Sequence, residues 1–307
     1  MPDPFVHCHL HSEFSLLDGA ARIEPLMRAA AELGMPAIAL TDHGTMYGAI
    51  DFYLQAQQHG LTPIIGMEAY VATRRHTDRD PKLDANPYHL ILLAADAEGY
   101  RNLLRLTTAA HMDGFYYRPR VDRELLARHS RGLIALSGCL QGEVTRAILR
   151  DDLGAAGEIA GAYREIFGTG NYFLEVQDHG LPDQQRNIRG MRRLSEDLGI
   201  PLIATNDVHY VHRAEAEAQD VLMCIQMNAT LAATDKPRMG DTPEFYLKSA
   251  EEMAQRFAEL PQALRTPLEI AGRAALTLDL GATQLPPFPV PDGLTPDSYL
   301  RSLCEEG

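Results

Sequence analysis

An alternation of short apolar runs with longer amphipathic segments constrains the fold more than any other feature of the sequence. The apolar runs predict strands over residues 6–11, 37–41, 63–71, 89–94, 133–137, 172–176 and 201–205. The amphipathic segments predict helices over residues 24–33, 47–59, 97–111, 153–167 and 184–198. Strands that alternate with helices pair in parallel through crossover connections. Seven such strands favour an α/β fold of the (β/α) barrel type over an open sheet.

The pattern changes after Thr205. Helices are predicted over residues 214–227, 249–257 and 262–275, and Ser249 with Glu252 has the spacing of a capping box. Four prolines within residues 285–293 then predict a stiff linker, which a helix over residues 296–306 follows. We therefore expect a barrel domain with a helical extension over residues 1–284. We expect residues 285–307 to be a linker and the start of a following region, so that the chain is the N-terminal piece of a longer protein.

The charge balance limits the classes of binding partner. The chain has 42 acidic and 28 basic side chains, a net charge of −14, whereas a domain that binds nucleic acid alone is usually basic. Either nucleic acid is not the substrate, or bound metals and a partner supply positive charge, and the 12 histidines favour metal. The four cysteines are scattered, and the sequence has no secretion signal and no apolar run of bilayer length. These features favour a cytoplasmic protein without a membrane partner.

Side chains of metal-ligand type lie at or near an end of almost every predicted strand. His7, His9 and His11 alternate, so on a strand they would share one face. His7 is expected to point inward below the metals, as a core residue or as a partner of a ligand. The candidate metal ligands are His9, His11, Asp18, His43, Glu68, His89, Cys139, Asp207 and His209. Barrel enzymes carry their chemistry at the C-terminal ends of the strands. Nine ligands are too many for one ion and suit two or three.

Individually, several of these side chains have simpler interpretations. Asp18 fits a turn, His89 a buried core histidine and Cys139 a small buried apolar residue. Asp42 is interpreted as the cap of a helix that starts near Thr45, with His43 as the metal ligand. Separate explanations of this kind would be needed for nine ligand-type side chains at one rim of the barrel. A single metal centre explains them together and is therefore favoured.

The motifs His-x-His, Thr-Asp-His-Gly, Gly-x-Glu, Ser-Gly-Cys and Thr-Asn-Asp-x-His occur in this order. Together they resemble the polymerase and histidinol phosphatase (PHP) domain, specifically the branch at the N-terminus of bacterial DNA polymerase III α subunits. The resemblance runs from about Phe5 to the end of the chain and implies a distorted (β/α)7 barrel with three divalent metal ions. It implies three ligand groups: His9, His11, Glu68 and Asp207; Glu68, His89 and Cys139; and Asp18, His43 and His209.

The resemblance also implies an activity, metal-dependent 3′–5′ exonuclease proofreading. A metal-held water would be the nucleophile, with Asp18 and Asp207 as the catalytic carboxylates. Zinc fits the mixed ligands, with manganese or iron as alternatives. The implied partners are a DNA primer 3′ end, the remainder of the polymerase α subunit and other replisome subunits. Arg118 and Arg120 are candidates for contacts with the DNA backbone, although a solvated loop is an equal interpretation.

Two other functions stay open. Some family members that have lost ligands serve as scaffolds for a separate proofreading exonuclease, and others are small-molecule phosphomonoesterases. The complete ligand set argues against the scaffold, and the predicted continuation beyond the linker argues against a stand-alone phosphatase. The polymerase active site itself is expected beyond Gly307, so nucleotide addition is not expected from these residues.

Overall fold

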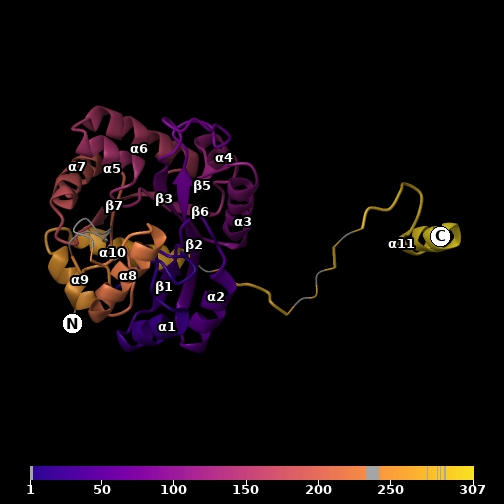
Figure 1. Cartoon of the computed structure of the whole chain (residues 1–307), viewed down its shortest axis with the longest axis horizontal. Helices are drawn as coiled ribbons and strands as arrows, with labels where there is room; N and C mark the ends of the chain where they lie inside the picture. Colours follow the sequence, from indigo (N-terminus) through magenta and orange to yellow (C-terminus); the bar gives the residue numbers. More distant parts are fainter. Residues whose placement is uncertain (1–2, 233–241, 275, 282, 284, 287) are drawn as a thin grey trace. The chain divides into compact units, whose positions relative to one another are not determined.

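A computed structural model describes residues 3–232, 242–274, 276–281, 283, 285–286 and 288–307. The chain divides into two compact units, Met1–Leu276 and Thr277–Gly307 (Figure 1). The predicted boundary at residue 284 and the linker assignment remain predictions. Over the described ranges, no helix combines the length and the apolar character that crossing a bilayer requires.

Eight strands form one curled sheet in the first unit. The strands are β1 (Ala37–Leu40), β2 (Thr62–Val71), β3 (Tyr88–Ala94), β4 (Phe115–Tyr116), β5 (Arg118–Val121), β6 (Leu133–Leu136), β7 (Tyr172–Gln177) and β8 (Leu202–Thr205). Their order is β4-β5-β2-β3-β6-β7-β8, and β1 also pairs with β2. Six of these strands match runs that the sequence predicts, whereas the short hairpin of β4 and β5 was not predicted.

The prediction of parallel pairing throughout is wrong at β3. This strand is antiparallel to both β2 and β6, whereas β1 with β2, β6 with β7 and β7 with β8 are parallel. The segment between β2 and β3 contains no helix. Consecutive strands without a helical crossover pair antiparallel, as in a hairpin. Reversal of β3 places its first residues at the rim where the parallel strands end.

The segment of residues 6–11 joins the two edges of this sheet, β1 and β8. It bends at Cys8 and His9 and forms only one isolated bridge, between Leu10 and Val208, so the predicted regular strand is absent. Backbone hydrogen bonds run from it to both sides: Ala39 N–H to His7 O (2.9 Å), Thr41 N–H to Leu10 O (2.8 Å), His11 N–H to Val208 O (2.7 Å) and Val208 N–H to His9 O (3.2 Å). With β1, β2, β3, β6, β7 and β8, the segment makes a closed ring of seven. The predicted distorted (β/α)7 barrel is confirmed.

Helices surround this ring (Figure 1). They are α1 (Ile23–Glu32), α2 (Ala49–Gln58), α3 (Ala97–Met112), α4 (Arg123–Arg128), α5 (Glu143–Leu149), α6 (Leu153–Phe167), α7 (Pro182–Leu198), α8 (Ala216–Gln226), α9 (Ala250–Arg256) and α10 (Pro261–Arg273), with a short 3₁₀ turn at Arg213–Glu215. Helix α11 (Pro296–Glu306) lies in the second unit. The predicted capping box begins α9, where Ser249 Oγ accepts from Glu252 N–H (3.2 Å) and Glu252 accepts from Ser249 N–H (2.8 Å). The short helices α4 and α5 were not predicted.

Alternate residues of the strands enter two separate apolar clusters. One cluster packs the sheet against the helices and includes Met67, Leu92, Ala135 and Leu174. The other consists mainly of strand residues and includes Ile64, Ile91, Leu136, Phe173 and Ile203. The second cluster fills the barrel, as expected for a small closed sheet. Polar side chains that also point into the barrel lie at one of its ends, beyond this inner apolar cluster.

Candidate metal centre

One end of the barrel carries all nine predicted ligands. His9 and His11 lie on the closing segment, and Asp18 lies in the turns that follow it. His43 follows β1, Glu68 lies within β2 and Cys139 follows β6, while Asp207 and His209 follow β8. His89 is near the start of β3 because that strand runs in the opposite direction. The strand ends thus bring together residues that are distant in sequence.

The first ligand group comprises His9, His11, Glu68 and Asp207. The Nε2 atoms of His9 and His11 are 3.2 Å apart. Glu68 Oε2 is 2.9 Å from the His11 Nε2 atom, and Asp207 Oδ1 is 3.1 Å from the His9 Nε2 atom. His9, His11 and Asp207 lie close enough to hold one ion. Two imidazole nitrogens that face each other between two carboxylates form a donor arrangement typical of a metal site.

Glu68 connects this group to the second. Its Oε1 atom is 2.8 Å from His89 Nδ1, and the Cys139 Sγ atom lies 3.8 Å from both of these atoms. Its Oε2 atom faces His11 and is 3.1 Å from His43 Nδ1. One carboxylate therefore presents one oxygen to the second group and the other to the first group and to His43, which is the geometry of a bridging ligand.

The third group centres on Asp18. Its Oδ2 atom is 3.1 Å from the Nε2 atoms of both His43 and His209. These three residues, with His11, form another set that could hold an ion. The three groups are thus contiguous, and together they contain every ligand that the sequence analysis predicts.

The electrostatics of the cluster are those of a cation site. Burial opposes the charged form of each buried group, but the pKa of His11 is nevertheless raised to about 10, because Asp207 and Glu68 outweigh the burial. The nearby histidines hold the pKa values of Glu68 and Asp207 well below their usual range, against the effect of burial. Burial, with the nearby Glu68, raises the pKa of the Cys139 thiol. Protons on His9 and His11, whose pKa values are raised, balance the carboxylates here, and metal ions would replace those protons.

Two buried atoms test whether a metal fits. Asp207 Oδ1 and His43 Nδ1 have no hydrogen-bond partner with acceptable geometry among the described residues, although each lies 3.1 Å from an oppositely charged or polar neighbour. Buried polar atoms without partners are rare, and an ion is one explanation for them. Asp207 also has a left-handed backbone with φ of 47°, a conformation that clusters at functional sites. The donor set fits bound cations.

A second layer of polar groups orients the histidines. Glu175 accepts from His9 Nδ1 (2.7 Å) and from the Gly138 N–H (3.1 Å), while Ser15 Oγ accepts from His11 Nδ1 (3.0 Å). These bonds leave the Nε2 atoms of both histidines free to bind metal, as is usual for metal-binding imidazoles. Sequence analysis missed Glu175, although an acidic residue within the apolar run of residues 172–176 was a usable signal.

Two expectations about neighbouring residues are wrong. Asp42 caps no helix: its buried carboxylate accepts from the N–H and hydroxyl of Ser12, at 2.7 and 2.9 Å, and from Ser15 Oγ. His7 does not share the face of His9 and His11, because the closing segment is not a regular strand. Its Nε2 atom is instead 2.9 Å from the carbonyl oxygen of Lys248. His7 is therefore a core residue, and burial lowers its pKa to about 4.

Comparison with known families decides the identity of the fold. The family model for the PHP domain matches residues 7–179, which is more than half of the chain. The chain belongs to the PHP domain family. The resemblance that the motifs carry is confirmed.

The curated relatives of this PHP domain include subunits of bacterial polymerases. DNA polymerase III subunit alpha of Treponema pallidum is 43% identical over 305 residues, which cover 99% of this chain and 26% of that protein. The subunit of Thermus aquaticus is 43% identical over 314 residues, covering 97% and 25%. The subunit of Deinococcus radiodurans is 41% identical over 320 residues, covering 99% and 23%. The chain thus spans about a quarter of the length of these relatives.

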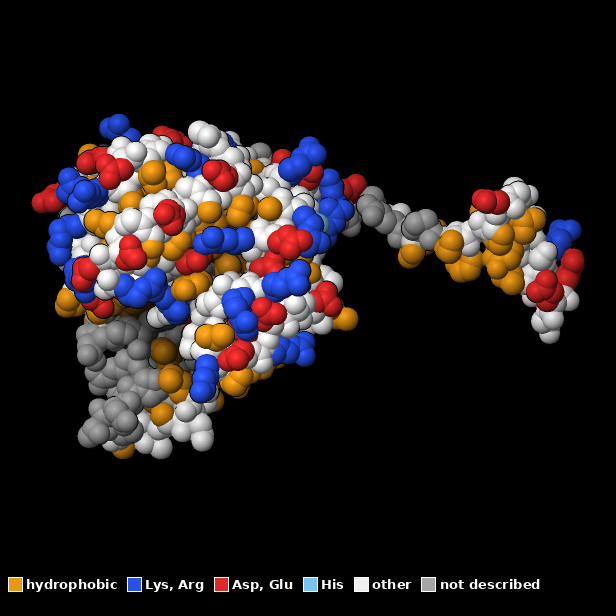
Figure 2. All heavy atoms as spheres, turned by 90° about the horizontal axis from the view of Figure 1, so that it is seen from above, with side chains coloured by type: hydrophobic (Ala, Val, Ile, Leu, Met, Phe, Trp, Pro, Cys, Tyr) orange, Lys and Arg blue, Asp and Glu red, His pale blue; other side chains and the backbone are white. Residues whose placement is uncertain are grey.

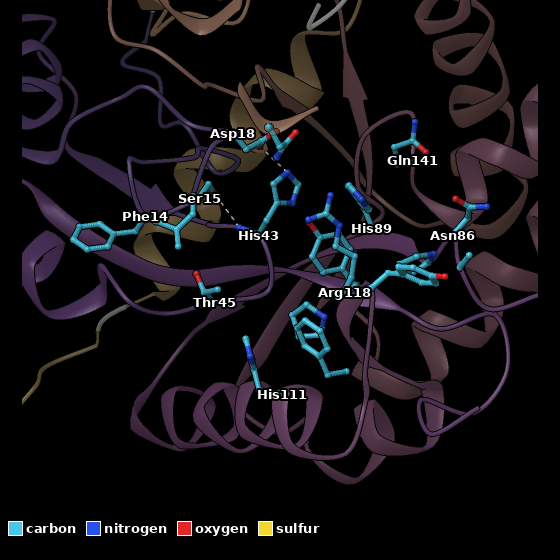
Figure 3. Close-up of a pocket in the computed structure, with 18 of the residues that line it drawn as sticks. Phe14, Ser15, Asp18, His43, Thr45, Asn86, His89, His111, Arg118 and Gln141 are labelled. Atoms are coloured by element: carbon cyan, nitrogen blue, oxygen red, sulfur yellow. Dashed lines mark hydrogen bonds and ion pairs between the residues drawn. The ribbon is translucent and has the colours of Figure 1, made fainter. Parts of the chain in front are cut away.

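The two arginines predicted to contact DNA have different environments. Arg120 is fully buried, with a relative exposure of 0%, and donates to backbone carbonyl oxygens of His76, Asp78, Asp84 and Gly114. A buried guanidinium with these partners is not available to a DNA phosphate. Arg118 is exposed, and it lines a cavity of about 480 Å³ that Asp18, His43 and His89 also line (Figure 3). Of the pair, Arg118 alone faces the metal centre.

Proposed function

We propose that this PHP domain is a metal-dependent phosphodiesterase that removes nucleotides from DNA 3′ ends. It would proofread as part of a bacterial DNA polymerase III α subunit in the cytoplasm. The observation that carries this proposal is the set of three contiguous ligand groups joined through Glu68. A single-metal site would not need a bridging carboxylate, whereas paired ions suit a phosphodiester, whose attacking and leaving oxygens both need stabilisation.

The residues would divide the work as follows. One ion would be held by His9, His11, Glu68 and Asp207, one by Glu68, His89 and Cys139, and one by Asp18, His43 and His209. Zinc is the first choice because one donor is a thiolate, with manganese or iron as alternatives. Such ions supply an activated water at neutral pH and positive charge for the phosphate. Asp18 and Asp207, the proposed catalytic carboxylates, would hold the ions that activate this water.

The partners follow from the relatives. The primer 3′ end is the proposed substrate, and the remainder of the α subunit, with other replisome subunits, would deliver it. We assign nucleotide addition to parts of such a polymerase other than these residues.

Substitution Asp207→Asn tests the proposal. Asparagine keeps the size of the side chain and tolerates the left-handed backbone at this position, but it removes the charge that holds an ion. With a 5′-labelled single strand and added zinc or manganese, the wild type should shorten the DNA from its 3′ end. The Asp207→Asn variant should shorten the DNA at least about a hundredfold more slowly, while its thermal unfolding remains cooperative. The control is Asp51→Asn, on the exposed face of α2, which should retain full activity.

Other outcomes select the other functions. A wild-type domain that degrades no DNA with either metal, yet binds a separate exonuclease, would be a scaffold. A domain that hydrolyses histidinol phosphate or similar monoesters far better than DNA would be a phosphomonoesterase.

A further inference from the structure

Exposed aromatic rings line the cavity next to the metal centre. Tyr47, Phe115 and Tyr117 have relative exposures of 59%, 51% and 63%, and all three line the same cavity as Asp18 and His43. Large exposed rings gathered at one cavity are unusual for a soluble surface and mark binding sites. The metal centre alone does not account for them.

His111 lies next to two of these rings. The ring of His111 is 6.3 Å from that of Tyr47 and 6.2 Å from that of Phe115. Phe115 belongs to β4, which pairs with β5, and Tyr117 forms the tip of this hairpin. Tyr117 has a left-handed backbone with φ of 58°, which is costly for a bulky residue unless the surroundings hold it. The hairpin thus holds an aromatic ring outward at the cost of backbone strain.

Arg118 completes this wall. Its guanidinium carbon lies 5.7 Å from the centre of the Tyr70 ring, and Tyr70 stacks on His43 with the ring centres 5.5 Å apart. One ring therefore separates the cation from a candidate metal ligand. Within the described part of the chain, no carboxylate lies within ion-pair distance of Arg118. An unpaired cation at this position is available to an anionic ligand.

We propose that Tyr47, Phe115, Tyr117 and Arg118 form a cradle that selects unpaired DNA ends. The rings stack on the bases next to the terminal nucleotide, and Arg118 binds a backbone phosphate beside the one at the metal centre. Stacking on aromatic side chains tolerates any base, because every base has a π face. Bases in a duplex are already stacked and paired, so a frayed end gains contacts that a paired end lacks. This inference rests on the proposed function and assigns its substrate specificity to named residues.

Binding, rather than cleavage, gives the clearest test. The metal-loaded chain is titrated with a fluorescent (dT)8 strand whose phosphorothioate linkages resist hydrolysis, and with an abasic strand of the same length. The wild type should bind (dT)8 at least about ten times more tightly than the abasic strand. Phe115→Leu and Tyr117→Asn should each lose most of this difference and leave the affinity for the abasic strand unchanged. Asparagine suits the backbone at Tyr117, so that variant should fold. Arg118→Gln should weaken the binding of both strands by similar factors.

Controls separate this inference from the proposed function. Phe288→Leu removes an exposed ring from the second unit and should leave the preference intact. If the wild type binds both strands equally, or the ring variants bind like the wild type, the cradle is refuted, even when DNA is still degraded. A preference that depends on the rings, without hydrolysis under any metal, would support the cradle and refute the exonuclease.

Discussion

At the scale of single residues, Glu175 influences the metal centre without belonging to it. Its carboxylate accepts hydrogen bonds from His9 Nδ1, from the backbone N–H of Gly138 and from the side-chain amide of Gln177 (3.0 Å). Glu175→Gln keeps the shape but weakens the hold on the imidazole. Metal affinity should fall about 10- to 100-fold, as is typical for partners of metal-binding histidines.

Competition with a chromophoric chelator measures this change. Glu165→Gln, on an exposed position of α6, is the matched control and should bind metal like the wild type. Equal affinities for wild type and Glu175→Gln would show that the carboxylate serves only the barrel packing.

The ligands illustrate what single residues reveal in a sequence. Residue type and position near strand ends were sufficient to find Glu68 and His89, because chemistry and strand termini are both visible in the sequence. The role of Asp42 was not, since it depends on which serines meet its carboxylate. For His7 the expected core position holds, but the face it occupies depends on the path of the closing segment. Glu175 was missed because a single acid in an apolar run does not show which imidazole it faces.

At the scale of elements, Arg120 anchors the segment between β2 and β3. Its guanidinium donates to four backbone carbonyl oxygens, three of them in that segment. Arg120→Met should destabilise the domain by about 3 kcal/mol or more, because it leaves buried carbonyl groups without donors. Arg118→Met, two residues away but exposed, should cost less than about 0.5 kcal/mol.

Urea unfolding of the two variants gives this comparison directly. Equal decreases in the free energy of unfolding would mean that water molecules donate to the carbonyl groups in place of the guanidinium. Protease cleavage confined to residues 72–87 in Arg120→Met would locate the damage at the segment itself.

Elements also differ in how well a sequence predicts them. Helix α6 begins and ends at the predicted residues, since its periodicity is long and its ends are marked. The direction of β3 was missed, although no helix is predicted between residues 71 and 89 and a connection without a crossover helix favours antiparallel pairing. The β4–β5 hairpin was missed for a different reason: strands of two and four residues are too short to show a period.

At the scale of the whole molecule, the metal ions would offset a net charge of −14. Figure 2 shows basic and acidic side chains interspersed on one face of the first unit, so no large basic surface is visible there to attract DNA. Elemental analysis of protein purified without chelator should find more than one transition metal per chain. Loading should weaken as the pH falls, because protons compete for ligands such as His11.

Metal removal should also lower the melting temperature, since ligands from the closing segment and from the loop after β8 share the ions. A reconstituted stoichiometry of one or less, or a melt that chelation leaves unchanged, would contradict the multinuclear centre. Cys139→Ser is an internal check, as it should release one class of ion and leave the others.

The closing segment has a consequence for the order in which the domain is made. The ribosome delivers His9 and His11 first, whereas their neighbours beyond β8 emerge roughly 200 residues later, on the order of ten seconds or more at bacterial rates of synthesis. Asp18 and His209, which share a contact of 3.1 Å, are 191 positions apart. A nascent chain interrupted before Val208 has neither the residues that close its ring nor the full set of metal donors. Full occupancy of the centre would therefore require that translation has passed this point and that the barrel has closed.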